Sequence, residues 1–146
     1  MKRAISMICC LAIVAAPVTP ALAQSPFGKI LKTKYNLKSA SCYTCHMRSS
    51  EISEDQQAAY KKNKKAFRNA FGKALGSHLK GKDVTKRLAA VKKLESDDPK
   101  KVKVADEVKV EFLEALAKVE AEKSADGKTY GELLKTGKLS GVKPAG

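Results

Sequence analysis

The chain has 146 residues and a formal net charge of +14, from 29 Lys and Arg residues against 15 Asp and Glu residues. This length predicts one small domain, and the charge predicts a strongly basic surface. After residue 23 the sequence contains no apolar stretch of the roughly eighteen residues that a spanning helix requires. The part of the chain after that residue is therefore expected to have no membrane span.

Residues 1–23 have the pattern of a secretory signal peptide. Two basic residues precede an apolar run over residues 5–18, and the segment ends in Ala21-Leu22-Ala23, the small-x-small pattern at which signal peptidase cleaves. We expect a mature chain of residues 24–146 with a net charge of +12, because cleavage removes two positive charges. This product is expected to be periplasmic or otherwise exported.

The four cysteines divide between these two parts of the chain. Cys9 and Cys10 belong to the signal segment, and a lipid anchor at Cys10 is the weaker alternative to cleavage after Ala23, because the residues before Cys10 are not small. The mature chain keeps Cys42 and Cys45. In an exported protein two cysteines ordinarily predict one disulfide.

The residue after Cys45 changes that interpretation. Cys42-Tyr43-Thr44-Cys45-His46 is a C-x-x-C-H sequence, the attachment signature of c-type haem. On a helical turn this spacing places Cys42, Cys45 and His46 on one face, where both thiols can form thioethers with the haem vinyl groups while His46 binds the iron. A thioredoxin-like redox motif would need neighbouring strands, and a zinc site would need further Cys or His residues close by.

A helical pattern begins after the motif, with Ser53 as the predicted N-cap. Its apolar stripe consists of Tyr60, Phe67, Phe71 and Leu75, and lysines fall largely on the other faces. These positions predict one amphipathic helix whose stripe packs in the core. Phe67 and Phe71 are also expected to contact the porphyrin, since a haem in so small a domain shares the core.

The next segments predict a loop at residues 75–81, a helix from Asp83 through Leu94, and a further helix after Pro99. In the last of these, Val104, Val108, Phe112, Leu116 and Val119 have helical spacing, although the neighbouring valines also alternate as in a strand. Residues 124–127 predict a turn, and residues 130–134 a short helix. Residues 137–146 are expected to be a frayed tail.

The motif and the signal peptide together resemble the monohaem c-type cytochromes. This resemblance implies an all-α, cytochrome c-like domain over residues 24–146 built around one covalent haem. It implies an exported protein that transfers single electrons between partner proteins and that is not an enzyme.

The second axial ligand of the iron is open in the sequence. The only methionine of the mature chain, Met47, adjoins His46 and cannot reach the opposite face of the ring, which leaves His78 or no residue at all. An open position would make the iron five-coordinate, and the protein could then bind NO or CO or act on a peroxide. An accidental motif would instead leave a haemless, disulfide-bonded structural protein.

The positive charge has three interpretations. It can keep a small exported protein soluble, or it can attract acidic redox partners to the haem edge. Binding to nucleic acid is disfavoured, because the lysines are spread along the whole chain and export separates the protein from most nucleic acid.

Overall fold

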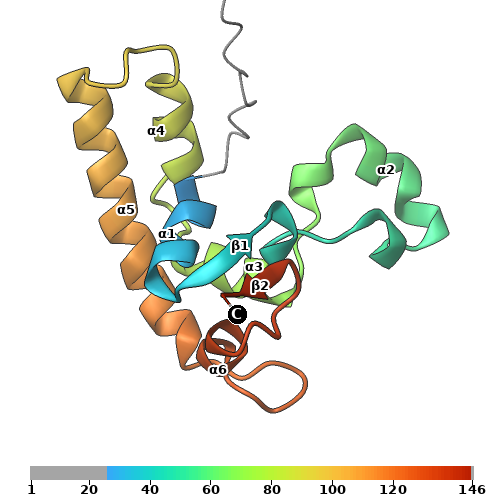
Figure 1. The fold of residues 1–146 in the computed structure, drawn as a ribbon. Helices are drawn as coiled ribbons and strands as arrows, with labels where there is room; N and C mark the ends of the chain where they lie inside the picture. The colour runs from blue at the N-terminus through green and yellow to red at the C-terminus, as the bar shows by residue number, and fades with distance from the viewer. Residues whose placement is uncertain (1–25, 146) are drawn as a thin grey trace, which may run out of the picture.

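The computed structural model describes residues 26–145, which are mostly helical (Figure 1). The predicted signal peptide and Gln24, the expected first mature residue, lie outside these residues. The helices of the described part are α1 (Pro26–Lys34), α2 (Gln57–Lys62), α3 (Ala70–His78), α4 (Val84–Ala90), α5 (Pro99–Glu120) and α6 (Tyr130–Lys135). Two short strands, β1 (Leu37–Ala40) and β2 (Val142–Pro144), pair antiparallel.

The core of this fold is organised around α5, against which α1, α3, α4 and α6 pack. Phe112, Leu116 and Val119 of α5 are completely buried and Val108 nearly so, while Val104 is half-buried. Phe27 of α1 stacks on Phe112 with ring centroids 4.6 Å apart. The helical interpretation of residues 99–119 is therefore confirmed, and the strand alternative is wrong.

Local capping signals fix the start of two helices. Asp98 accepts a hydrogen bond from the backbone N–H of Lys100 at 2.9 Å, and Pro99 occupies the first turn of α5, where its missing N–H costs nothing. At α6, Thr129 and Glu132 form a reciprocal capping box. The predicted turn at residues 124–127 is also present, closed by a hydrogen bond from the Gly127 N–H to the Ser124 carbonyl.

The single helix predicted from Ser53 to Leu75 is wrong. The chain forms 3₁₀ turns at Glu54–Gln56 and Lys64–Ala66 on either side of α2, and α3 begins only at Ala70. Asn63 interrupts the pattern with φ −146° and ψ 74°, and Phe67 is extended. The apolar spacing is compatible with a helix, but residues 67–69 pair with residues 45–47 instead, and this tertiary pairing overrides the local preference.

Two further boundaries differ from the sequence-based expectations. His78 is the last residue of α3 rather than part of a loop, and α4 ends at Ala90 rather than near Leu94. Both differences are of a few residues at helix ends, where sequence patterns are weakest. The start of α4 directly after Asp83 agrees with the prediction, although Asp83 is left-handed, φ 47°, and makes no side-chain cap.

The expectation of a frayed C-terminal tail is wrong over the described residues. Residues 142–144 form β2, which pairs with β1, and Val142 is buried. The fold is therefore mostly helical but not plainly all-α. Pairing with β1, more than 100 residues earlier in the chain, orders a segment that has too few apolar residues to show a pattern of its own.

Residues 47–67 project from the rest of the molecule as a small lobe that carries α2 (Figure 1). Ile52 and Tyr60 are buried within it, and Tyr60 meets Phe67 edge-on at 5.4 Å. Within residues 26–145, no helix combines the length and the hydrophobicity that a membrane span needs.

Candidate functional site

The C-x-x-C-H segment forms a tight turn between β1 and the projecting lobe. Residues Cys42–Thr44 are a 3₁₀ helix capped by Ser41, whose hydroxyl accepts from the Tyr43 N–H. The N–H groups of Cys45 and His46 both donate to the Cys42 carbonyl, at 3.2 and 3.0 Å. This turn holds the backbone of Cys42, Cys45 and His46 within one tight bend of five consecutive residues.

The two cysteines are free thiols in different environments. Cys42 is exposed, whereas Cys45 is half-buried and packs against the hydrophobic core. Burial raises the pKa of the Cys45 thiol from 9.0 to about 11, and the positive charge of Arg68 partly opposes this rise. Cys45 is therefore a neutral thiol at neutral pH, and Cys42 is the more accessible sulfur.

His46 is oriented by a backbone carbonyl. Its Nδ1 lies 3.3 Å from the carbonyl oxygen of Phe67. Because that oxygen can only accept, the hydrogen bond requires the ring hydrogen on Nδ1, which leaves the lone pair of Nε2 free. Histidines that bind metals commonly donate their second ring nitrogen to a carbonyl or carboxylate in this way.

Residues 67–69 form a segment that lies against the motif and is hydrogen-bonded to it. The Met47 N–H donates to the Phe67 carbonyl, and the Asn69 N–H donates to the Cys45 carbonyl, both at 3.1 Å. Between these bonds, His46 and Arg68 face each other as an isolated antiparallel bridge. The carbonyl that orients His46 is thus itself held by the backbone N–H of Met47, the residue directly after the motif.

Two glycines let neighbouring segments approach the motif closely. A Cβ at Gly72 in α3 would lie 1.9 Å from the Cys45 carbonyl oxygen, so only glycine fits there without movement of the backbone. A Cβ at Gly141, which has φ +74°, would lie 2.5 Å from the Thr44 nitrogen, and the Gly141 carbonyl accepts from the Ser41 N–H at 2.9 Å. The start of α3 and the segment before β2 therefore enclose the turn.

The other candidate residues lie apart from the imidazole. His78 is six residues beyond Gly72, about 9 Å along the axis of α3, and its Nε2 contacts a carboxylate oxygen of Glu122 at 2.6 Å. Phe71, the residue before Gly72, is 1% exposed and packs edge-on against Tyr130 in the core. The structure brings the backbone carbonyl of Phe67 to His46, whereas His78 contacts Glu122.

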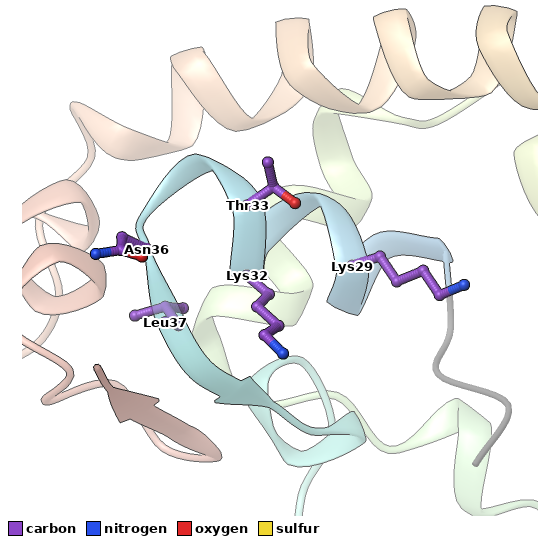
Figure 2. A pocket seen from close by; sticks show the side chains of 5 residues that line it. All are labelled: Lys29, Lys32, Thr33, Asn36 and Leu37. Atoms are coloured by element: carbon purple, nitrogen blue, oxygen red, sulfur yellow. The ribbon is translucent and has the colours of Figure 1, made fainter. Parts of the chain in front are cut away.

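Two surface pockets do not include the thiols or the imidazole. One, of about 540 Å³, is formed by α1 and the start of β1, and Figure 2 shows the Lys29 and Lys32 side chains extending from the same helix. The other, of about 260 Å³, lies beside the start of α3 and includes Asn69 and Phe71 in its wall. Neither is lined by Cys42, Cys45 or His46.

The residues that support the motif were not predicted from the sequence. A backbone carbonyl, such as that of Phe67, has no signature in a sequence, because every residue type supplies one. Asn69 did offer a signal, since an Asn before an apolar helical stretch is typical of an N-cap. The roles of Gly72 and Gly141 depend on contacts between distant segments.

Among residues 26–145, no three His, Cys, Asp or Glu side chains come together as a metal-binding group. Comparison with family models, with curated proteins and with solved structures finds no match to this chain. The motif and its surroundings are therefore the basis for assigning a function.

Proposed function

We propose that this chain is an exported electron-transfer protein that carries one haem, bound covalently to Cys42 and Cys45, with His46 as an iron ligand. Such a haem, when bound, supplies one-electron chemistry, because its iron changes between two oxidation states without bond chemistry on a substrate. The protein would then be a carrier rather than an enzyme.

The observation that supports this proposal most strongly is the hydrogen bond between His46 Nδ1 and the Phe67 carbonyl. It directs one ring nitrogen to the protein and leaves Nε2 available as a ligand, as metal-binding histidines require. The two thiols are free and belong to the same turn as the imidazole. This donor set suits a covalent haem, whereas a four-ligand zinc site needs further Cys or His residues.

The two thiols would fix the cofactor to the chain. In each thioether the S–H adds across one vinyl C=C bond, so no atoms are lost and the protein gains the mass of an intact haem. Cys42 is exposed and Cys45 borders the core, so the attached edge would lie between solvent and the hydrophobic interior. His46 would hold the iron from the same turn.

The proposal is tested by expressing the full chain in a host that exports it and supplies haem-attachment enzymes. The expected product starts at Gln24, carries one haem by intact-mass measurement, and gives a thioether haem spectrum in pyridine. His46→Ala, measured in buffer because pyridine itself replaces axial ligands, should lose the haem spectrum of the wild type, whereas His78→Ala, the matched control for loss of a histidine, should retain the attached haem. A haemless chain with Cys42 and Cys45 oxidised to each other would refute the proposal.

A basic strip, defined as residues 61–68, supports an acidic redox protein as the partner. It contains Lys61, Lys62, Lys64, Lys65 and Arg68, all exposed, and no Asp or Glu. Among the described residues, none of these cations forms an ion pair. The strip ends at Arg68, directly opposite His46, so its charge lies beside the proposed electron-transfer site.

The docking role is tested with two quadruple Lys→Gln variants that change the net charge equally. One replaces the four lysines of the basic strip. The other replaces Lys92, Lys93, Lys100 and Lys103, which lie around the connection between α4 and α5, away from the lobe (Figure 1). The first should slow electron exchange with an acidic partner and weaken its dependence on ionic strength more than the second. Equal effects would assign the charge to solubility alone.

One observation favours the alternative of an open iron site. His78 is engaged by Glu122, so the sequence's candidate for the sixth ligand already has a partner. A five-coordinate iron would bind a small gaseous ligand or act on a peroxide. A high-spin spectrum that changes with CO, and that is the same in His78→Ala, would support this function. A low-spin spectrum that becomes high-spin in His78→Ala would assign His78 as the sixth ligand and electron transfer as the function.

A further inference from the structure

The side chain and backbone of Asn69 hold three consecutive carbonyls of the motif. The Asn69 Nδ2 group donates to the Tyr43 carbonyl at 3.0 Å and to the Thr44 carbonyl at 3.1 Å. The Asn69 backbone N–H donates to the Cys45 carbonyl at 3.1 Å. One residue therefore binds every carbonyl between the first cysteine and the histidine.

These three carbonyls need partners from outside their own turn. The last carbonyls of a helical turn have no N–H ahead of them to accept from, so they must bind water, a side chain or another segment. A side-chain amide has two N–H hydrogens on one nitrogen, and Asn69 uses that group for two of the carbonyls. Aspartate and serine lack this paired donor.

Asn69 also holds the start of α3. Its Oδ1 accepts from the Gly72 N–H at 2.8 Å, which is the hydrogen bond of an N-cap residue. The two ends of the amide thus join α3 to the motif, at the point where Gly72 already approaches the Cys45 carbonyl. The capping function uses the oxygen, and the contact with the motif uses the nitrogen.

We propose that Asn69 is a positioning residue: through the bonds from its nitrogen atoms it fixes the turn of residues 42–46 and the orientation of the His46 ring toward haem. The effect on His46 passes through the extended segment 67–69, because the Phe67 carbonyl that orients the imidazole lies two residues before Asn69. This inference rests on the proposed function. Groups that orient a ligating histidine change cofactor binding and redox properties when they move.

The test uses Asn69→Asp and Asn69→Ser in the full, exported chain. Both replacements keep an oxygen that can cap α3, and both remove the amide donors. We expect the fraction of chain that carries haem to fall about tenfold, and the haem that is attached to show a shifted midpoint potential and a changed iron–histidine stretching band. Helical circular dichroism should remain that of the wild type. Asn36→Asp is the control, because Asn36 is exposed and lies outside both the motif and the basic strip.

Each outcome decides between interpretations. Wild-type loading and potential in both Asn69 variants would overturn the positioning role and leave only the cap. Unfolding of both variants would also overturn it, since the amide would then support the whole fold rather than the motif. A wild-type chain without haem would overturn the proposed function as well, which distinguishes that failure from a failure of the Asn69 inference alone.

Discussion

The contact between α3 and the motif can be tested by adding one methyl group at each of two glycines. Gly72 and Gly76 lie four residues apart in α3, so Gly→Ala at either position brings the same helix-propensity gain of up to about 1 kcal/mol. Their surroundings differ. At Gly76 the new Cβ would lie 2.3 Å from Nη1 of Arg68, the far end of a flexible side chain, whereas at Gly72 it would meet the Cys45 backbone at 1.9 Å.

The magnitude follows from what must move. At Gly72 the carbonyl oxygen of Cys45 must retreat by more than 1 Å to reach the 3.0 Å that real Cβ contacts respect. That oxygen also accepts from the Asn69 N–H, so the shift weakens a second interaction. Overpacking of this kind costs about 1–3 kcal/mol, with a lost hydrogen bond adding about 1 kcal/mol. After the propensity gain, Gly72→Ala should destabilise by about 2 kcal/mol.

Thermal unfolding followed by circular dichroism measures this difference. For a domain of this size, about 2 kcal/mol lowers Tm by roughly 6–10 °C. Gly76→Ala should leave Tm unchanged or raise it slightly, because the Arg68 guanidinium can move aside. Equal Tm values for the two variants would refute the close packing of α3 on the Cys45 carbonyl.

Three further predictions concern the thiols, the C-terminal segment and the core. In haem-free chain expressed without residues 1–23, a pKa of about 11 makes the Cys45 thiolate about 100-fold scarcer at pH 8 than the thiolate of a thiol whose pKa is 9.0. Iodoacetamide should therefore label Cys42 first, and Arg68→Ala should slow the labelling of Cys45 further. Equal labelling of the two cysteines would contradict the burial of Cys45. Gly141 and Gly127 both have φ +74°, so Gly→Ala at either position costs about 1–2 kcal/mol of backbone strain. In urea unfolding Gly141→Ala should cost about 1–3 kcal/mol more than Gly127→Ala, because a Cβ at Gly141 meets the Thr44 backbone while a Cβ at Gly127 has nothing within 4 Å. Leu116→Ala should lose about 2–5 kcal/mol in the same assay, against less than about 0.5 kcal/mol for Val110→Ala at a position that is 55% exposed; similar losses would contradict the assigned core face of α5.

The helices that the sequence predicts correctly are those whose signals are local. In α5 the stripe from Val108 to Val119 repeats with helical spacing, and Asp98 and Pro99 mark its start. The short helix at residues 130–135 has its capping pair within four residues. Such elements depend on neighbours in the sequence, so periodicity and capping preferences are sufficient to find them.

The misassigned segments depend on distant partners. Tyr60, Phe67, Phe71 and Leu75 have helical spacing, yet Phe67 is extended because its carbonyl binds the N–H of Met47. Residues 142–144 have almost no pattern, and they are ordered by pairing with β1. No local preference reports either partner.

The residues of the candidate site also differ in whether the sequence alone can identify them. Cys42, Cys45 and His46 are adjacent in sequence and carry distinctive side chains, so their spacing alone identifies them. The carbonyl of Phe67 and the amide of Asn69 come from a segment about twenty residues later, and their importance is visible only once that segment lies against the motif.

The hydrogen bond between Ser41 and Gly141 also affects the order in which parts of the chain fold. The two residues are 100 positions apart, so the bond closes a long loop, and contacts of this kind carry a large entropic cost and form late in folding. During synthesis at about 5–20 residues per second, Gly141 is added roughly 5–20 s after Cys45. For that interval the segment that contacts Ser41, Tyr43 and Thr44 does not yet exist, so the turn of residues 42–46 has only its own hydrogen bonds and those to residues 67–69. Closure of the turn by the C-terminal segment is therefore expected to be one of the last steps of folding.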